Sequence, residues 1–339
     1  MYNKGIRVSL RDAEKAKNVL RSSGLIQRNL EIIRDGEYLI FPVSEFPQHT
    51  DGMWEKCFAD FSERRPVVGD YRELITGYKG REELLPSSYD VIGTKILIKI
   101  PREIRGIESD IGNALLSMHR SVDSVFRDDG VGGKYRTRTV ELVAGKGGTE
   151  TVLTEYGFRF RLDVSKTFFS PRLASERNRV ASTIGRNEKI LDMFAGVGPF
   201  SIYAAAKTVD GSVEAYDINH YAVSYLRENA RINKLANITA HRMDSAEISS
   251  VGEFDRVIMN LPRGSSGMLV KALSMLAGGG VIDYYELIED STLNERCGEL
   301  EGLMGVRVED IRKVKTYSAG GSIYHLLLRK YSSAGAIRV

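Results

Sequence analysis

Cysteine is scarce in this chain of 339 residues, which contains only Cys57 and Cys297. Two cysteines cannot form a disulfide framework and do not supply the four ligands of a structural zinc site, so we expect a reducing compartment and no metal. No stretch approaches the roughly 18 apolar residues of a membrane span, and residues 1–5 lack the apolar core of a signal peptide. We therefore expect a cytoplasmic protein without a membrane segment.

An excess of charge is also missing. The 48 lysines and arginines stand against 45 acidic residues, which leaves a formal net charge of +3. An excess this small does not indicate a polyanionic partner, so binding to nucleic acid has to be argued from local clusters. Hydrophobic residues make up 42% of the chain, which is typical of a globular protein with a sizeable core.

The first part of the chain predicts a small module over residues 1–66, in the order strand, helix, strand, strand. A strand is expected at 6–10 and a helix at 11–20. Asp35-Gly36 between two apolar runs indicates a hairpin. The single tryptophan, Trp54, is interpreted as a packing residue, with a base-stacking role as the alternative. The module contains no catalytic cluster, and residues 60–69 read as a linker.

A second α/β unit is expected over residues 71–165. Its predicted elements are a strand at 91–100, a helix at 107–122, and two strands at 151–153 and 158–164 around a turn.

Residues 166–331 alternate between strand and helix patterns. A helix is expected from Pro171 to residue 182, with Ser170 as its N-cap. Seven strands and four further helices follow, and this alternation predicts a largely parallel, doubly wound sheet of the Rossmann-like α/β class. The expected strands are 189–192, 212–217, 237–242, 254–260, 279–285, 307–314 and 322–330; the expected helices are 199–207, 220–233, 266–276 and 291–303.

The stretch 189–200 organises this region. Asp192 closes a buried strand, and Gly196 and Gly198 form a tight turn before the next helix. Free backbone N–H groups at such a turn suit a nucleotide-like ligand. A dinucleotide site would need a third glycine at position 201, which is Ser201, so NAD and FAD are disfavoured. An aspartate in D-x-F-x-G-x-G suits a cationic ligand without phosphate, such as S-adenosylmethionine; the alternative is an ordinary glycine turn.

Polar residues follow four strand ends in succession, where ligands bind in doubly wound sheets. Asp217 is placed to accept hydrogen bonds from ribose hydroxyls and Asp244 from an adenine amine. Asn260, in Asn-Leu-Pro262, can present its amide to a nucleobase edge. Each residue alone is more often a helix cap or a turn residue, but four in a row predict a ligand site.

Basic and aromatic residues cluster between 155 and 186. Phosphates need such cations and unstacked RNA bases need such rings, although a solvated face and core aromatics explain about half of the set. Glu176 stands among arginines one turn into a helix, where the alternative is a carboxylate favoured by the helix dipole. The cluster comprises Arg159, Arg161, Lys166, Arg172, Arg177, Arg179 and Arg186 with Phe158, Phe160, Phe168 and Phe169, preceded by Lys134, Arg136 and Arg138.

Several motifs together closely resemble the archaeal tRNA (guanine-37 N1)-methyltransferase family. They are Phe169-Ser-Pro-Arg-Leu-Ala-Ser-Glu-Arg177, Asp192-Met-Phe-Ala-Gly-Val-Gly-Pro-Phe200, Asp217-Ile-Asn219, Val257-Ile-Met-Asn-Leu-Pro262 and Gly279-Gly-Val-Ile282, with an upstream segment that begins at Arg136. The resemblance implies a class I S-adenosylmethionine-dependent methyltransferase fold over 166–331. It also implies an RNA-binding domain over 71–165 and a tRNA-contacting module over 1–66.

The resemblance further implies methyl transfer to N1 of guanine 37 of a tRNA, bound through its anticodon stem-loop and body by a monomeric enzyme. Glu176 would be the general base, Arg136 would stabilise O6, and Asn260 would hold the guanine. The cofactor would be bound by Asp192, Phe194, Gly196, Gly198, Asp217, Asn219, Asp244 and Asn260. The RNA would be contacted by Arg138, Arg172, Arg177, Pro262, Arg263 and Tyr317.

The chemistry agrees with these roles. Guanine N1 carries a proton at neutral pH, so its methylation needs a base, and we expect a carboxylate with a somewhat raised pKa. The negative charge that moves to O6 needs a cation, and the guanine must leave the anticodon stack. Relatives often have Tyr-Ala-Pro where this chain has Tyr317-Ser-Ala319, and lysine in place of Arg263. The alternatives are a wyosine-pathway enzyme acting at the same position, by methylation or aminocarboxypropyl transfer, and a non-catalytic tRNA-binding protein.

Overall fold

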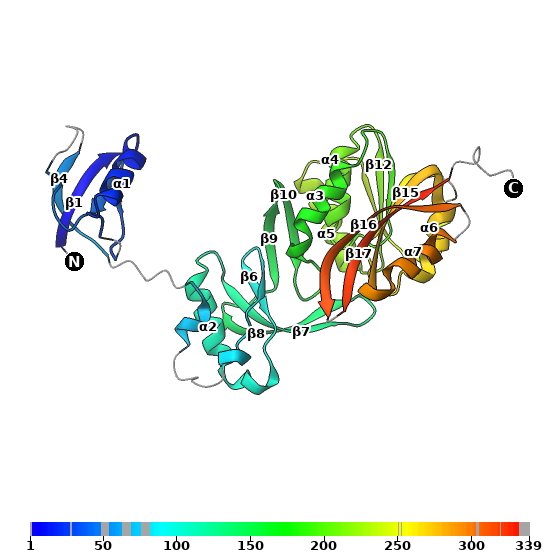
Figure 1. The fold of residues 1–339 in the computed structure, drawn as a ribbon, viewed down its shortest axis with the longest axis horizontal. Helices are drawn as coiled ribbons and strands as arrows, with labels where there is room; N and C mark the ends of the chain where they lie inside the picture. The colour runs from blue at the N-terminus through cyan, green and yellow to red at the C-terminus, as the bar shows by residue number, and fades with distance from the viewer. Residues whose placement is uncertain are drawn as a thin grey trace. The chain divides into compact units, whose positions relative to one another are not determined.

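The structure, a computed structural model, describes residues 2–27, 29–48, 54–62, 69–75, 82–249, 251, 253–302, 305–318 and 320–331. The chain divides into two compact units, Met1–Glu73 and Leu74–Val339 (Figure 1). No helix among these residues combines the length and the apolar character needed to cross a membrane.

The N-terminal unit contains a four-stranded antiparallel sheet in the order β2-β3-β1-β4, with one helix. The predicted order of strand, helix and two strands is confirmed, as is the hairpin at Asp35-Gly36, where Gly36 has a φ of +58°. The elements are β1 (Tyr2–Ser9), α1 (Ala13–Ser22), β2 (Ile33–Asp35), β3 (Tyr38–Pro42) and β4 (Glu55–Asp60). Strand β4 was not predicted, and it extends into the expected linker. The predicted module end at residue 66 lies outside the described residues.

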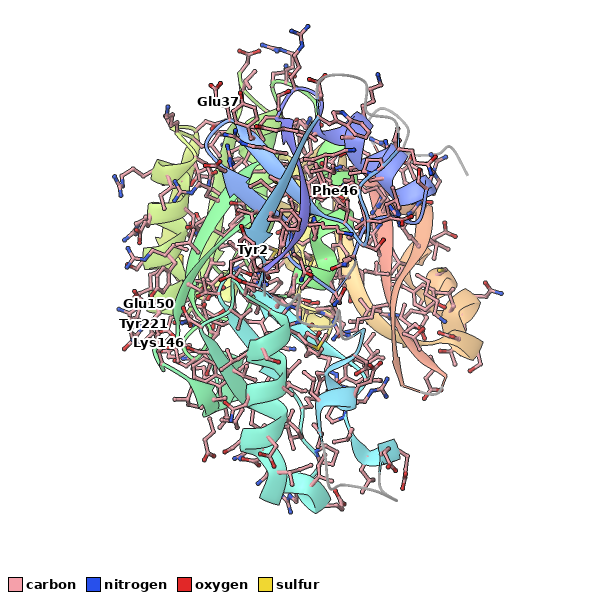
Figure 2. All side chains as sticks on the ribbon, turned by 90° about the vertical axis from the view of Figure 1, so that its left-hand side faces the viewer. Tyr2, Glu37, Phe46, Lys146, Glu150 and Tyr221 are labelled. Atoms are coloured by element: carbon pink, nitrogen blue, oxygen red, sulfur yellow. The ribbon has the colours of Figure 1, made fainter. Side chains whose placement is uncertain are left out.

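The core of this unit forms between the sheet and α1. Alternate residues of β1, Ile6 and Val8, face Ala16 and Leu20 from one side of the helix. Trp54 is buried in the same cluster, which supports a packing role over a base-stacking one. Figure 2 shows the side chains of the molecule.

The middle of the chain forms a second four-stranded sheet, β5-β6-β7-β8, in which β6 and β7 are parallel. The predicted strand at 91–100 is wrong as a single element, because Gly93, with a φ of +57°, turns the chain between β5 and β6. The elements are η2 (Glu82–Leu84), β5 (Tyr89–Ile92), β6 (Lys95–Ile98), η3 (Arg102–Ile107), α2 (Glu108–Met118), β7 (Ser124–Gly132) and β8 (Thr137–Gly145). Strands β7 and β8 were not predicted, because charged Arg127 and Asp128 are buried in ion pairs and obscure the apolar pattern.

Strands β9 (Glu150–Glu155) and β10 (Phe158–Asp163) form the predicted hairpin. The hairpin packs on the helices of the C-terminal sheet: Arg161 N donates to Asn229 Oδ1 over 2.7 Å, and Phe160 is buried beside Tyr203. Arg161 also pairs with Glu150, labelled in Figure 2, over 2.9 Å. Because the backbone of the hairpin is hydrogen-bonded to Asn229 of the region that follows, we propose that this region begins near residue 150 rather than 166.

The C-terminal region contains all seven predicted strands, in the order β13-β12-β11-β14-β15-β17-β16. The first five are parallel, and β17 is antiparallel to β15 and β16. The strands are β11 (Lys189–Asp192), β12 (Ser212–Asp217), β13 (Ile238–Arg242), β14 (Phe254–Met259), β15 (Leu276–Glu289), β16 (Val306–Ser318) and β17 (Gly321–Lys330); the helices are η4 (Pro171–Leu173), α3 (Ala174–Ser182), α4 (Pro199–Lys207), α5 (His220–Ile232), η5 (Ser245–Glu247), η6 (Ser266–Met268), α6 (Leu269–Met275), η7 (Asp290–Thr292) and α7 (Leu293–Glu301).

Helices cover both faces of this sheet (Figure 1). Leu191, Val257 and Ile282 point to a core completed by α6 and α7. Their neighbours Ile190 and Ile258 point to the opposite core, completed by α3, α4 and α5. This alternation along buried strands makes the sheet doubly wound and confirms the predicted fold class.

The start of the predicted helix at 171 differs from expectation. The Ser170 side chain makes no capping hydrogen bond, and the segment opens as the 3-10 turn η4 before α3 begins at Ala174. The carbonyl of Ser170 instead accepts hydrogen bonds from the Arg177 guanidinium at 3.2 Å, so this arginine anchors the approach to the helix.

Gly198 adopts a φ of +89°, and a Cβ atom there would lie 2.1 Å from Leu226 Cδ1. We expect Gly198→Ala to lower the free energy of unfolding by about 1–3 kcal/mol, because the added methyl group overpacks the core and strains the turn. Chemical denaturation measures this loss.

Gly267→Ala is the matched control, because nothing lies within 4 Å of the Cβ position there. Equal stability of the two variants would contradict the packing argument.

Candidate active site

The carboxyl ends of three neighbouring parallel strands bring predicted ligand residues to one edge of the sheet. Strands β11, β12 and β14 end at Asp192, Asp217 and Met259, and the last is followed by Asn260. Asp192 pairs in register with Ala215 of β12 and Ile258 of β14, so the ends lie side by side. The prediction that these residues share one edge is therefore confirmed, whereas their binding roles stay predictions.

Asp192 is buried and is held by its own turn. Its Oδ2 accepts a hydrogen bond from the Ser201 hydroxyl at 2.7 Å, and its Oδ1 accepts one from Phe194 N at 3.3 Å. Burial raises the pKa of Asp192 to about 7, and the negative charge of Asp217 contributes to the rise. Ser201, which stands where a dinucleotide site would have its third glycine, thus has a structural role.

Asp217 reaches back over the glycine turn. It accepts hydrogen bonds from Gly196 N and Asn219 N, both at 2.8 Å, and burial raises its pKa. Neither Asp192 nor Asp217 forms an ion pair with a cation in the part of the chain that the structure describes. Two adjacent carboxyl groups without a cationic partner favour a positively charged ligand.

The structure contradicts the expectation that the turn presents free backbone N–H groups. The amides of Phe194 and Gly196 donate to the two aspartates, and that of Gly198 donates to the carbonyl of Ala195 at 2.9 Å. The lip of the site therefore presents carboxylates rather than amides, which suits a ligand without phosphate.

Three further predicted ligand residues differ in how much their side chains are engaged. Asn219 is buried and its amide is used by the protein, since Oδ1 caps α5 at Tyr221 N and Nδ2 donates to Lys166 O. Asp244 is exposed and caps η5 at Ala246 N with one oxygen. The half-buried Asn260 amide makes no hydrogen bond with the described residues, so it is available to a ligand.

Glu176 lies on α3, buried against the sheet. The guanidinium of Arg179 donates to both of its oxygens, from Nε at 2.9 Å and from Nη2 at 2.6 Å. The hydroxyl of Tyr285 donates to Oε1 at 2.8 Å. Burial acts to raise the pKa of Glu176, but these hydrogen bonds and the Arg179 charge outweigh it and lower the pKa below its usual value. The expected raised pKa is therefore wrong, and the carboxylate is ionised at neutral pH.

Three residues predicted separately come together around Arg263, which follows Asn260 by three positions in the chain. Arg136 Nη1 donates to the carbonyl of Arg263 at 3.1 Å, and the Arg263 guanidinium lies over the Tyr317 ring, 4.3 Å from its centroid. Partial desolvation and the Arg263 charge lower the pKa of Arg136. Arg136 has a φ of +50°, an uncommon conformation for a non-glycine residue.

The other arginines predicted to contact RNA differ in accessibility. Arg177 is 1% exposed, and its guanidinium forms a two-pronged pair with Glu155, so it cannot reach a bound RNA; for this residue the structure contradicts the prediction. Arg138 is largely enclosed between Asp128 and Asp90. Arg172 also pairs with Asp90, at 2.6 Å, but remains partly exposed.

Sequence reasoning missed Tyr285, which contacts Glu176, and the buried polar residues that lie beyond Arg179. Asp283 and Tyr285 of β15 and His325 of β17 are buried, and all lie within runs that are otherwise apolar. The available signal was the charged or polar residue inside a buried strand, as in Val281-Ile-Asp283 and His325-Leu-Leu-Leu328.

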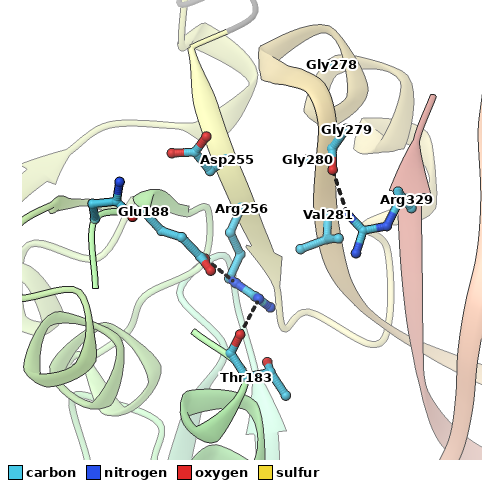
Figure 3. Close-up of a pocket in the computed structure, with 10 residues that line it drawn as sticks. Thr183, Glu188, Asp255, Arg256, Gly278, Gly279, Gly280, Val281 and Arg329 are labelled. Atoms are coloured by element: carbon cyan, nitrogen blue, oxygen red, sulfur yellow. Dashed lines mark hydrogen bonds and ion pairs between the residues drawn. The ribbon is translucent and has the colours of Figure 1, made fainter. Parts of the chain in front are cut away.

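A separate hollow of about 370 Å³ lies at the opposite edge of the sheet (Figure 3). Asp255, near the start of β14, and the glycines 278–280, near the start of β15, line it. Arg256 donates there to Glu188 at 2.8 Å and to the Thr183 carbonyl at 3.2 Å. The hollow is therefore distinct from the edge that carries the predicted ligand residues.

Comparison with known proteins supports the fold and identifies the family. Residues 151–304 match the model described as the TRM5/TYW2 methyltransferase domain. Residues 71–149 match the TYW2 N-terminal domain, and residues 5–49 match the tRNA methyltransferase 5 N-terminal domain.

Individual relatives match along much of the chain. The tRNA (guanine(37)-N(1))-methyltransferase Trm5b of Pyrococcus abyssi is 39% identical over 91% of this chain and 92% of its own. A solved complex of aTrm5 with tRNALeu has a TM-score of 0.75 at 30% identity and covers 96% of this chain and 99% of that one. A tRNA(Phe) (4-demethylwyosine(37)-C(7)) aminocarboxypropyltransferase of Methanocaldococcus jannaschii is 34% identical over 58% of this chain and 80% of its own.

Asp192 should make binding of a cationic ligand depend on pH. Because its pKa is about 7, the carboxyl group is mostly neutral at pH 6 and mostly ionised at pH 8. We expect the affinity for S-adenosylmethionine to rise about tenfold between these pH values, as measured by calorimetry.

Asp192→Asn, which keeps the acceptor for Ser201, should remove the part of this dependence that does not come from the ligand's own amine. An identical pH profile in the variant would contradict a role for the Asp192 charge.

Proposed function

The chain belongs to the tRNA (guanine-37 N1)-methyltransferase family, and we propose which of its residues carry out methyl transfer from S-adenosylmethionine to N1 of guanine 37 in tRNA. The observation that carries the assignment is the extent of the match. The guanine-37 methyltransferase relative covers 91% of this chain, whereas the aminocarboxypropyltransferase relative covers 58%. The N-terminal unit, which matches a methyltransferase N-terminal domain, thus favours methyl transfer over the wyosine-pathway alternative.

S-adenosylmethionine is the cofactor of this family, and it supplies the methyl group when bound. Asp192 and Asp217 fit such a ligand, because their negative charges lack a cationic partner in the described structure. Asp217, whose oxygens each accept one backbone hydrogen bond, retains lone pairs for ribose hydroxyls. Phe194, Gly196, Gly198 and one oxygen of Asp244 complete the proposed site, while Asn219 acts by capping α5.

Glu176 is the proposed general base. A base must be ionised before it accepts a proton, and Arg179 and Tyr285 hold Glu176 in that state. The N1–H bond of guanine breaks and the proton moves to a Glu176 oxygen, while the electron pair left on N1 is delocalised toward O6. That pair then forms the bond to the methyl carbon, and the methyl–sulfur bond of a bound donor would break with its electrons remaining on sulfur. The low pKa makes Glu176 a weaker base than expected, so its contribution depends on position as well as basicity.

Arg136 is the proposed cation at O6, and Asn260 is proposed to hold the guanine. Among the described residues, the guanidinium of Arg136 is anchored through one nitrogen, to the Arg263 carbonyl, so its remaining N–H groups are available to a developing negative charge. Asn260 offers a donor and an acceptor with no competing partner in the described chain. Arg263 stacked on Tyr317, with Pro262 and Arg172, is proposed to contact the RNA nearby.

The substrate is a tRNA, and we propose that the N-terminal unit contacts its body while residues 82–331 bind the anticodon stem-loop. An exposed aromatic cluster supports this division: Phe58 stacks on Tyr2 at 5.9 Å and meets Phe46 edge-on at 5.6 Å. Lys4 and Lys56 lie over the Phe46 ring, so the cluster combines aromatic rings with cations, as the RNA-binding surfaces of proteins do. We further propose that the protein acts as a monomer, since one chain supplies each group of the site. We also propose that it acts in the cytoplasm.

Methylation of tRNA transcripts with guanine or adenine at position 37 tests the function. We expect labelled methyl transfer only to the guanine transcript, with the label on N1. Glu176→Gln should lower kcat by about 10²–10⁴-fold, because loss of general base catalysis costs that much, while the Kd for S-adenosylmethionine stays unchanged.

Label on the adenine transcript would contradict the function. A normal kcat of Glu176→Gln would remove Glu176 as the base. Glu83→Gln, in η2, is the matched control.

Phe58 is 54% exposed, so its role can be tested without disturbing a core. We expect Phe58→Ala to weaken binding of full-length tRNA by about 1–3 kcal/mol, the worth of one stacked base, and to leave binding of an isolated anticodon stem-loop unchanged. Filter binding of both RNAs measures the difference.

Tyr38→Ala, an exposed aromatic on β3, is the matched control. Equal weakening for both RNAs would refute the assignment of this unit to the tRNA body.

A further inference from the structure

A continuous chain of hydrogen-bonded polar side chains, most of them buried, leads away from Glu176 into the interior of the sheet. Arg179 Nη2, which donates to Glu176, also lies 3.0 Å from His325 Nδ1. His325 Nε2 lies 2.8 Å from Asp283 Oδ1. Both His325 and Asp283 are 1% exposed, so solvent does not satisfy either group.

The chain continues to the far side of Asp283. The second carboxylate oxygen of Asp283 accepts a hydrogen bond from Arg256 Nη1 at 2.6 Å, and Arg256 Nε donates to Glu188 at 2.8 Å. Asp283 is therefore held from two directions, and its negative charge is stabilised, which is why its pKa is lowered despite burial. A carboxylate fixed in this way can orient the imidazole that it contacts.

The donors in this chain determine the tautomer of His325. A guanidinium can only donate, so Nδ1 must accept the hydrogen bond from Arg179 and cannot carry a proton. An ionised carboxylate can only accept, so Nε2 must carry the proton that bonds to Asp283. His325 is thus neutral, with its hydrogen on Nε2. Tyr285, whose ring centroid lies 5.0 Å from that of His325, packs beside it and donates to Glu176.

We propose that His325 is a positioning residue for methyl transfer: it accepts a hydrogen bond from Arg179 and thereby fixes the guanidinium that orients Glu176, while Asp283 sets its tautomer. This inference rests on the proposed role of Glu176 as the base. The side chain of Arg179 is 23% accessible, so the contact with Glu176 does not fully restrain its guanidinium group. The bond to His325 supplies the third contact that holds the guanidinium plane.

Two substitutions separate the contact with Arg179 from the contact with Asp283. Asn places its side-chain oxygen close to the position of Nδ1, so His325→Asn keeps an acceptor for Arg179. Gln places its terminal group close to the position of Nε2, so His325→Gln keeps a partner for Asp283 and loses that acceptor. We expect His325→Gln to lower kcat about tenfold, with the KM values for tRNA and S-adenosylmethionine within about twofold of wild type, and His325→Asn to retain most of kcat.

His119→Gln is the matched control, since His119 contacts Tyr89 in the middle sheet, outside this chain of side chains. Thermal unfolding of each variant separates loss of activity from loss of fold. An equal loss of kcat in the Asn and Gln variants would assign the effect to packing and overturn the proposal, and so would a normal kcat in a folded His325→Gln.

Nitrogen NMR of the histidine-labelled wild-type protein tests the tautomer without any activity measurement, and it decides the proposal if the variants do not fold. We expect an unprotonated Nδ1 and a protonated Nε2 for His325 at neutral pH. A protonated Nδ1 would overturn the inference, because it could not accept from Arg179. A normal kcat in Glu176→Gln would instead refute the proposed base and leave the tautomer result standing, so the two failures are distinguishable.

Discussion

The buried ion pair between Glu176 and Arg179 is the interaction on which the proposed site depends. An ionised carboxylate in a protein interior is costly unless a cation and hydrogen bonds compensate for its lost hydration. Here Arg179 supplies two hydrogen bonds and a charge, and Tyr285 supplies a third hydrogen bond. These contacts keep Glu176 ionised, but they also lower its affinity for a proton. The arrangement therefore exchanges basicity for a defined position and ionisation state.

The carboxyl groups at the strand ends, a short distance along the chain, have the opposite electrostatic environment. Asp192 and Asp217 have no cation among the described residues, and burial raises the pKa of each. The backbone amide groups of the turn between them donate hydrogen bonds to these carboxylates. The edge of the sheet thus presents negative charge rather than hydrogen-bond donors. That difference separates a site for a sulfonium ligand from one for a dinucleotide, which needs free amides for its pyrophosphate.

The arginines of the basic cluster serve two different purposes. Arg177 is enclosed with Glu155, and Arg138 lies between two aspartates of its own sheet, so acidic groups of the protein already neutralise both. Arg136 and Arg263 remain accessible near Asn260, where a guanine is proposed to bind. A local excess of positive charge therefore overstates the surface available to RNA, because part of it neutralises buried acids.

The sequence by itself determined the seven strands, the hairpin at Asp35-Gly36 and the gathering of polar residues at one edge, because each depends on local periodicity, turn chemistry and chain direction. The family motifs pointed to Glu176, Arg136 and Asn260. Only the tertiary structure decided that Arg177 is buried, that the turn amides are occupied, and that His325 and Asp283 reach Glu176 through Arg179. The contacts of Arg179 with His325 and of Glu176 with Tyr285 join residues more than one hundred positions apart, and the others depend on how separate elements pack, which no local pattern encodes.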